Sequence, residues 1–206
     1  SASLGVRAGR VSEAAGGLSG GPLSTLIILH EVGRQLVVEP FVETVVVAGS
    51  LIERAGSEAQ KQAYIADIIA GLKLWTLAWT EKGSRFDLAT VTTTARRYGD
   101  DYVLTGEKTA VVAAPWADHL VVSARTSGHR HDRGGVSLFV VDRRAATLDL
   151  TSFKTIDGRR DPEIHLRGVR GEFPGKEGQG VDAPESRPHP TLGSRRAEAA
   201  GGSGAA

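Results

Sequence analysis

The chain has 206 residues, and its 25 lysines and arginines against 24 aspartates and glutamates give a formal net charge of +1. This length suffices for one large domain or two small ones, and the absence of cysteine excludes disulfide frameworks, thiolate metal sites and cysteine nucleophiles. Near-neutral charge argues against a nucleic-acid-binding protein, and no apolar run approaches the ~20 residues that cross a bilayer. With no export leader in view, the sequence predicts a soluble, cytoplasmic protein.

The two ends of the sequence are rich in small residues. Residues 1–22 finish in a glycine-rich run and are expected to be a loop or disordered. Residues 181–206 consist mostly of Ala, Gly, Ser, Pro, Arg and acidic residues. They are expected to be a disordered tail, because such a composition buries too little apolar surface to offset the loss of chain entropy.

Residues 23–73 are expected to form a helical domain. Pro22 suits a first helical turn, and the residues after it give a broad apolar face at helical spacing: Leu23, Leu26, Ile27, Leu29, Val32 and Leu36. A second helix is expected from Pro40 to Gly56, although the valine run at residues 45–47 also fits a strand. A third helix is expected to begin at Ser57, where the spacing to Gln60 is that of a capping box.

From residue 74 onward the apolar pattern shifts toward a period of two. Seven short strands are expected, at residues 74–79, 90–98, 102–108, 119–125, 136–141, 148–150 and 164–166. Gly99-Asp100-Asp101 predicts a hairpin turn between the second and third strands. Helices first and strands second is typical of an α+β protein, here a helical domain followed by an antiparallel β-barrel or sandwich over residues 74–180.

Generic catalytic motifs are absent from the sequence. There is no Gly-x-Gly-x-x-Gly and no Gly-x-Ser-x-Gly, and Gly106-Glu107-Lys108-Thr109 lacks the spacing of a phosphate loop. His129 and His131 lie close together in a polar loop, but two histidines are too few for a zinc site. Motifs of this kind leave the function open.

Longer blocks of the sequence resemble the middle domain of the acyl-CoA dehydrogenases. Trp79-Thr80-Glu81, followed by Asp87-Leu88, is similar to the family pattern Thr-Glu-Pro-x-x-Gly-Ser-Asp, and residues 99–108 (GDDYVLTGEK) resemble Gly-Asp-x-Tyr-x-Leu-x-Gly-x-Lys. The next segments of that domain are similar to residues 117–118 and 121–126, to residues 135–142, and to residues 168–170 and 175–180. Residues 31–34, 39–41 and 56–61 resemble the N-terminal helical domain of the family, so the resemblance covers about residues 23–180. Residues 123–128 (SARTSG) further resemble the small subunit of pimeloyl-CoA dehydrogenases.

The resemblance implies a flavoprotein oxidoreductase that uses FAD to remove two hydrogens across the Cα–Cβ bond of an acyl-CoA thioester. It implies cofactor contacts at Leu77, Trp79 and Thr80, and again at Val111 and Val112. For Thr80 the alternative is an ordinary strand threonine, and for Trp79 it is a core aromatic. The resemblance also implies an oligomer, homomeric or heteromeric, and an acceptor of the electron-transfer flavoprotein type.

Three features depart from the family pattern. Val112 stands where the family has a threonine that bonds flavin N5, and Phe86 stands where a serine lies at the mouth of the acyl-CoA channel, which makes Phe86 a candidate substrate contact. Family members continue after the segment that ends at Gly180 into a helical bundle with the glutamate base. Here prolines at 184, 188 and 190 disfavour a helix, so the bundle and the base are expected to be absent.

Three functional hypotheses follow from these departures. The chain is a truncated acyl-CoA dehydrogenase, a non-catalytic subunit whose partner holds FAD and the base, or an inert gene fragment. In each case the isolated chain is expected to be inactive, and the carboxylates Glu81 and Asp87 are expected to be structural. The basic residues at 125, 129, 130, 131 and 133 form either a contact for CoA phosphates or a solvated loop.

Overall fold

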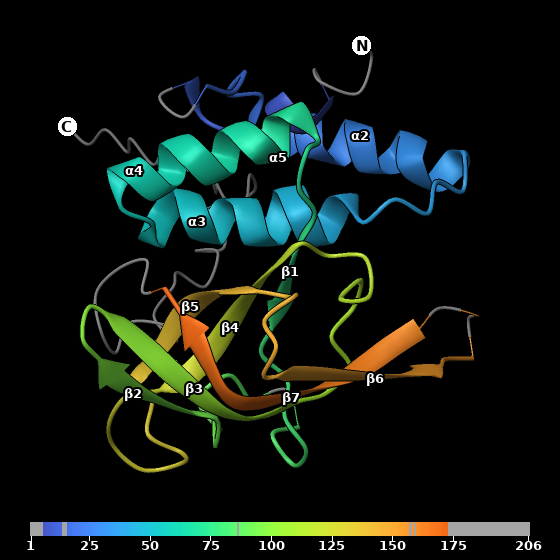
Figure 1. Ribbon diagram of the computed structural model, residues 1–206. Helices are drawn as coiled ribbons and strands as arrows, with labels where there is room; N and C mark the ends of the chain where they lie inside the picture. Colours follow the sequence, from blue (N-terminus) through green and yellow to red (C-terminus); the bar gives the residue numbers. More distant parts are fainter. Residues whose placement is uncertain (1–5, 14–15, 86, 157, 159, 173–206) are drawn as a thin grey trace, which may run out of the picture.

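The computed structural model has a layer of helices on one side of a curled β-domain (Figure 1). The structure describes residues 6–13, 16–85, 87–156, 158 and 160–172. The expectations for Phe86, for the tail at residues 181–206 and for the missing C-terminal bundle lie outside these residues. No helix in the described part is long and apolar enough to cross a membrane.

The helical layer follows the expected order along the chain. It contains α2 (Gly21–Arg34), the π-helix η2 (Val42–Gly49), α3 (Ser50–Ala55), α4 (Glu58–Gln60), the π-helical η3 (Lys61–Ile65) and α5 (Ala66–Ala70). Ser57 and Gln60 form the expected capping box, and Gly71 ends α5 with a φ of 71°. The valine run at residues 45–47 is helical, because Val45 is buried in this layer at 1% exposure and packing outweighs its strand propensity.

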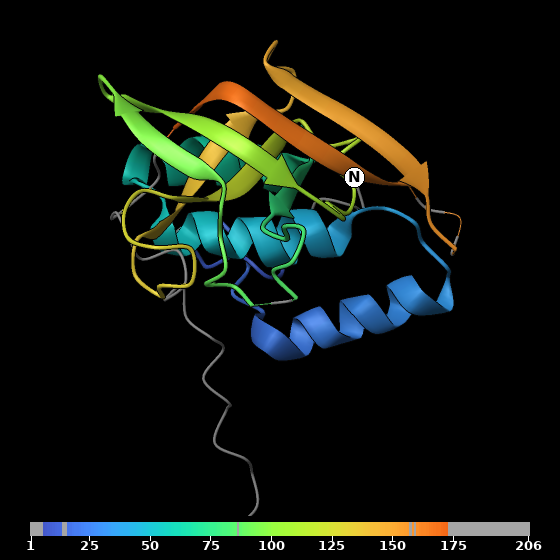
Figure 2. The same cartoon turned by 90° about the horizontal axis from the view of Figure 1, so that it is seen from below.

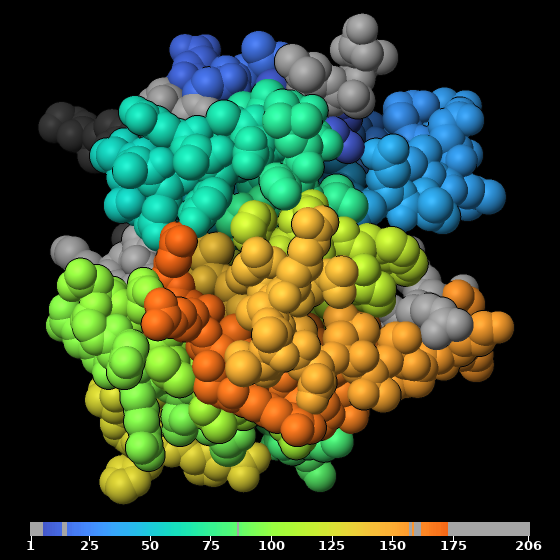
Figure 3. All heavy atoms as spheres, viewed as in Figure 1, coloured from blue at the N-terminus to red at the C-terminus, as the bar shows by residue number. Residues whose placement is uncertain are grey.

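The outer side of α2 is exposed. Leu23, Leu26 and Ile27 are 68%, 65% and 57% exposed, whereas Thr25, Ile28 and Leu29 face the rest of the layer. Figure 2 shows that α2 lies to the side of the β-domain, and Figure 3 shows it projecting from the layer. The broad apolar face expected from the sequence is therefore only half covered by the described residues.

The β-domain contains all seven expected strands. They are β1 (Trp75–Ala78), β2 (Thr94–Tyr98), β3 (Asp101–Lys108), β4 (His119–Arg125), β5 (Val136–Asp142), β6 (Leu148–Lys154) and β7 (Arg160–Gly171). Their order in the sheet is β1-β4-β2-β3-β7-β6, and β5, which is not on this path, pairs with β4 over the whole length of that strand.

The sheet is mixed, which corrects the expectation of a wholly antiparallel one. β1 runs parallel to β4, with Trp75 opposite His119, and β2 meets β4 in parallel at Thr94 and Arg125. The other pairs are antiparallel. The parallel pairing is possible because a long connection separates β1 from β4, and a parallel pair needs such a crossover.

Two core clusters lie on opposite faces of β4. Leu120 and Val122 point into the β-domain core with Phe139, whereas Val121 packs against the helical layer with Trp75. This alternation is the normal pleat of a strand. Since both faces of β4 are covered, the helical layer is held firmly against the β-domain.

A hydroxyl group joins the two layers directly. Thr44 in η2 is 3% exposed, and its Oγ1 donates a 2.9 Å hydrogen bond to the carbonyl O of Trp75. The same oxygen lies 3.1 Å from the backbone N of Trp75, which donates to it. These bonds fix η2 relative to the first strand, and the candidate site lies at this junction.

Candidate functional site

The two segments that carry the expected cofactor contacts lie side by side. Thr76 Oγ1 donates a 2.6 Å hydrogen bond to the carbonyl O of Val112. The backbone N of Thr109 donates to the carbonyl O of Thr80 over 2.9 Å. The structure therefore brings the end of β1 beside the loop that follows β3, and we call residues 77–80 and 109–113 together the wall segments.

The expected contact residues differ in how much of each side chain is accessible. Leu77, Trp79, Thr80 and Val112 are half-buried. The hydroxyl of Thr80 has no hydrogen-bond partner among the described residues, so it is available to a ligand. Val111 is 1% exposed within the β-domain core, so its side chain is not available.

The backbone around Val112 adopts an uncommon conformation. Ala110 and Ala113, on either side of the Val111–Val112 pair, have φ values of 52° and 63°. Non-glycine residues in this region cost on the order of 1–2 kcal/mol each. The loop keeps this shape because the Val111 side chain is buried and the Val112 carbonyl is held by Thr76. Strain of this kind is frequent where a loop must present its backbone to a ligand.

A buried ion pair clamps the wall segments together. Glu81 Oε1 lies 2.7 Å from Lys108 Nζ, and the two side chains are 3% and 0% exposed. Lys108 also donates to Ser123 Oγ over 3.0 Å, and Glu81 accepts from the backbone N of Thr92 and Thr93 over 2.7 and 3.0 Å. Since Glu81 follows one wall segment directly and Lys108 precedes the other, the pair sets their separation.

Both members of the pair are ionised at neutral pH. Burial alone would raise the pKa of Glu81, but the Lys108 ammonium and the bonds from Thr92 and Thr93 lower this pKa to about 2. Burial lowers the pKa of Lys108 to about 8, and the Glu81 carboxylate opposes that shift. Both oxygens of the Glu81 carboxylate thus have partners inside the protein, so Glu81 is structural, as expected. The role of Lys108 was not assigned from the sequence, although its position at the end of the Gly-x-Lys block was a signal for it.

Asp87 also serves the local structure. Its carboxylate accepts hydrogen bonds from the backbone N of Ala89 at 3.0 Å and from Thr90 Oγ1 at 2.5 Å. The bond from Thr90 is the main cause that lowers the pKa of Asp87. The carboxylate thus caps its own turn.

Arg125 holds the basic loop from inside. It is 7% exposed, and its guanidinium donates to six carbonyl oxygens, those of Ala89, Val91, Ser127, Arg130, Asp132 and Gly134. The idea that Arg125 meets CoA phosphates is therefore wrong, because all of its donor capacity is used inside the protein. The other four basic residues of the loop are exposed.

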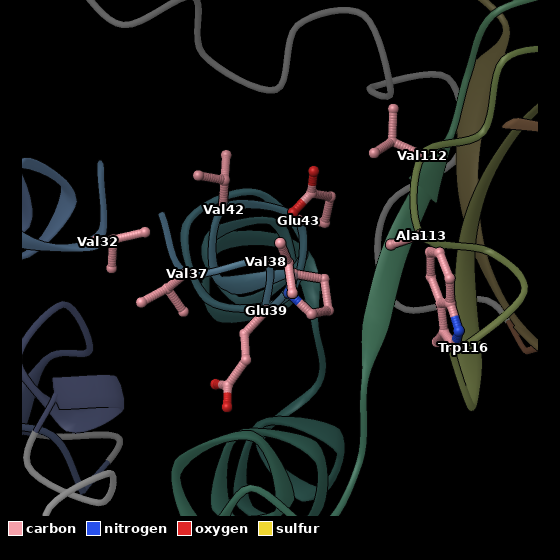
Figure 4. A pocket seen from close by; sticks show the side chains of 10 residues that line it. Val32, Val37, Val38, Glu39, Val42, Glu43, Val112, Ala113 and Trp116 are labelled. Atoms are coloured by element: carbon pink, nitrogen blue, oxygen red, sulfur yellow. The ribbon is translucent and has the colours of Figure 1, made fainter. Parts of the chain in front are cut away.

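A cavity lies between the helical layer and the second wall segment (Figure 4). Its volume is about 200 Å³, and most of its lining is apolar. Valines from the helical layer form one side, and Val112, Ala113 and Trp116 form the other. Two carboxylates, Glu39 and Glu43, complete the lining. Sequence reasoning missed this cavity, because its sides come from segments far apart in the chain and no motif marks either of them.

Comparison with protein families gives two matches that together cover most of the chain. Residues 1–72 match the acyl-CoA dehydrogenase N-terminal domain, and residues 76–169 match the acyl-CoA dehydrogenase middle domain.

Curated relatives carry names of the same kind. The chain is 33% identical over 143 residues to acyl-CoA dehydrogenase FadE29 of Mycobacterium tuberculosis, covering 69% of this chain and 37% of that protein. It is 32% identical over 143 residues to the caffeyl-CoA reductase-Etf complex subunit CarC of Acetobacterium woodii, covering 68% of this chain and 38% of that protein. The chain thus spans little more than a third of the length of these relatives.

Solved structures show the same arrangement of the two layers. A glutaryl-coenzyme A dehydrogenase in complex with glutaryl-CoA superposes with a TM-score of 0.80 at 25% identity, over 88% of this chain and 48% of that one. The ChsE4-ChsE5 complex from Mycobacterium tuberculosis superposes with a TM-score of 0.75 at 27% identity, over 86% of this chain and 46% of that one. The chain spans about half of each solved chain.

Proposed function

The chain belongs to the acyl-CoA dehydrogenase family, whose members are FAD-dependent oxidoreductases, and from this premise we propose that it forms the N-terminal and middle domains of an acyl-CoA dehydrogenase. The proposed reaction is the removal of two hydrogens across the Cα–Cβ bond of an acyl-CoA thioester. The observation that supports it most directly is the pairing of residues 76–80 with 109–113 beside a mostly apolar cavity.

The wall segments fit one side of a flavin ring. Thr80 offers an unpartnered hydroxyl, Trp79 offers a half-buried aromatic face, and the loop from Ala110 to Ala113 offers backbone in a rigid, strained conformation. FAD, when bound, supplies the acceptor for the hydride. The Glu81–Lys108 pair positions both segments without touching the ligand, because it lies buried behind them.

Neither of the two carboxylates that follow Thr80 in the sequence is free to act as a base. Glu81 is paired with Lys108, and Asp87 is bound to its own turn. A general base must come within about 3 Å of the proton that it removes. We therefore propose that the base comes from outside the described residues and that the isolated chain does not turn over acyl-CoA. Turnover of an acyl-CoA with an artificial electron acceptor would contradict this.

A second candidate function is that of a non-catalytic subunit in a heteromeric dehydrogenase. Val112 favours it, since this residue lacks the hydroxyl that the family pattern places against the flavin. Two of the similar proteins are named as parts of complexes, the CarC subunit and the ChsE4-ChsE5 complex. In this case a partner chain would supply the flavin and the base. Association with an electron-transfer flavoprotein and a cytoplasmic location belong to the proposal in both forms, and the inert fragment remains the third hypothesis.

Pimeloyl-CoA is the most specific substrate expectation, and it rests on the SARTSG block alone. Ser123 and Arg125 of this block are turned inward, since Ser123 binds Lys108 and Arg125 binds the carbonyl oxygens of its own loop. They support the fold and contribute no contact to the cavity. The acyl chain is better inferred from the cavity itself.

Flavin binding tests the proposal and separates its two forms. Titration of the purified chain with FAD, followed by the visible flavin spectrum, is expected to show binding. Val112→Thr is expected to tighten it about 2- to 10-fold, because one net hydrogen bond contributes about 0.5–1.5 kcal/mol. Val103→Thr is the matched control, since Val103 is a half-buried valine on β3 outside the wall segments.

Each result of this titration has a defined meaning. Binding by the unaltered chain supports the first form of the proposal. If the unaltered chain leaves the spectrum of the added FAD unchanged and Val112→Thr shifts it, the lost hydroxyl is the cause and the partner-subunit form is supported. If neither protein changes the spectrum of the added FAD, flavin binding by this chain is contradicted.

A further inference from the structure

We infer that the cavity between η2 and the loop at residues 111–116 selects acyl chains by the group at their far end, with Glu43 as the specificity-determining residue. A chain that ends in a hydrogen-bond donor, a hydroxyl or an ammonium, binds there in preference to a chain that ends in a carboxylate. The inference rests on the proposed function in taking the ligand to be an acyl thioester.

The size of the cavity suits a slender chain. Its volume of about 200 Å³ lies below the ~300–1,000 Å³ that is usual for sites of drug-sized ligands. The walls are mainly valine side chains, and Pro40 and Trp116 add rigid apolar surface. An extended alkyl chain would remove this apolar surface from water without any rearrangement of the walls.

Glu43 supplies the polar end of the cavity. Figure 4 shows its carboxylate on the side of η2 that faces Val112. The side chain is half-buried, and no described residue pairs with it or donates a hydrogen bond to it. Its oxygens are therefore free to accept from a ligand, and the partial desolvation strengthens such a bond.

Glu39 differs from Glu43 in both respects. Its carboxylate points away from Val112 in Figure 4, and Oε2 lies 3.5 Å from Arg7 Nη2. The Glu39 side chain is also 68% exposed. Glu39 thus shares the cavity edge but not the interior position, which makes it the matched control for Glu43.

A carboxylate at the far end of the chain has no favourable partner in the cavity. Its described lining contains no lysine, arginine or histidine. A second negative charge would enter a partly desolvated space beside Glu43, and like charges repel more strongly there than in water. A hydroxyl or ammonium in the same place would instead donate a hydrogen bond to the carboxylate oxygens of Glu43.

The test uses acyl-CoA probes of equal length that differ only at the far end. The three probes are ω-hydroxyoctanoyl-CoA, ω-aminooctanoyl-CoA and octanedioyl-CoA, and the CoA end keeps their orientation the same. Binding is followed by the fluorescence of Trp116, which lines the cavity and is 57% exposed. Trp116→Phe shows which part of the signal comes from this residue.

The unaltered chain is expected to bind the hydroxyl and amino probes at least about tenfold more tightly than octanedioyl-CoA, a difference of about 1.4 kcal/mol. Glu43→Gln is expected to reduce that ratio to less than about threefold, chiefly by improving the binding of octanedioyl-CoA. Glu39→Gln is expected to leave the ratio unchanged. A purely structural role of Glu43 would weaken all three probes together and leave the ratio intact.

Several results would overturn the inference. These are equal binding of the three probes by the unaltered chain, an unchanged ratio in Glu43→Gln, or the absence of any Trp116 signal with every probe. The FAD titration reads the flavin spectrum without any acyl-CoA present, so its result is obtained separately from this measurement, although Val112 and Ala113 belong both to a wall segment and to the cavity lining. A chain that discriminates among the probes but binds no FAD keeps the inference about the cavity and loses the flavin proposal.

Discussion

The wall segments and the outer face of α2 differ in whether the side chains around them are buried and paired or exposed to solvent. Behind the wall segments the charges are buried, paired and hydrogen-bonded, as in the contact between Glu81 and Lys108. On the outer face of α2, large apolar side chains such as Leu26 remain exposed to solvent. The charges behind the wall segments are thus paired within the β-domain, whereas the helical layer is left with a face that the described residues do not cover.

This difference indicates where stability depends on single residues. A buried charge without its partner is costly, because the desolvation of the remaining charge is not compensated. An exposed leucine already contacts water in the folded chain, so its loss changes little. The following predictions test that contrast.

The largest change in the free energy of unfolding is expected when Lys108 is replaced. Lys108→Met leaves Glu81 buried without its counter-ion and should lower the free energy of unfolding by about 3–5 kcal/mol, measured by urea denaturation. The double change of Glu81→Leu with Lys108→Met should recover much of this loss, since it removes both charges. Lys154→Met, at an exposed position on β6, is the control and should change the free energy by less than about 0.5 kcal/mol. Equal effects at the two lysines would contradict the structural role of the pair.

Glu81 is expected to make the free energy of unfolding depend on pH, with an effect of intermediate size. Its folded-state pKa of about 2 lies below the ordinary 4.5, so the ionised carboxylate stabilises the fold above the unfolded-state value. This stabilisation is lost as the pH falls from about 4.5 through about 2, and the shift corresponds to about 3 kcal/mol. Urea denaturation at several pH values measures it. Glu81→Gln should have a flatter profile in that window, and a parallel profile in the variant would assign the dependence to other carboxyl groups.

The smallest effect is expected on the outer face of α2. Ile27→Ala should lower the free energy of unfolding by less than about 0.5 kcal/mol, because this isoleucine is 57% exposed. Ile65→Ala in the same layer should lower it by about 2–5 kcal/mol, because Ile65 is fully buried. A large loss at Ile27 would show that the face of α2 is covered in solution by something outside the described residues.

Local features of the fold were predictable because each depends on a few neighbouring residues. The seven strands follow from alternation within short windows, and the capping box follows from the spacing of Ser57 and Gln60. The pairing of the strands was less accessible to sequence reasoning. The parallel contact of β1 with β4 depends on how the helical layer delivers Trp75 to the edge of the sheet, and no local pattern records that.

The candidate site shows the same division. The wall segments could be named from the sequence because the family blocks around Thr80 and Lys108 are contiguous. Two other features could not be predicted from the sequence. They are the burial of the Val111 side chain and the hydrogen bonds of Arg125 to six carbonyl oxygens, and both depend on segments that the fold brings together. The cavity was invisible for the same reason, because Glu43 and Val112 meet only across two layers.

The sequence by itself determined the family, the order of helices before strands and the helix caps, because periodicity and turn chemistry act over a few residues. The tertiary structure alone decided which charges are buried, which face of α2 stays exposed and which carboxylate enters the cavity. The physical reason is that burial and electrostatic pairing depend on distance in space. Glu81 and Glu43 are the same residue type, and only their surroundings make one a buried clamp and the other an acceptor for a ligand.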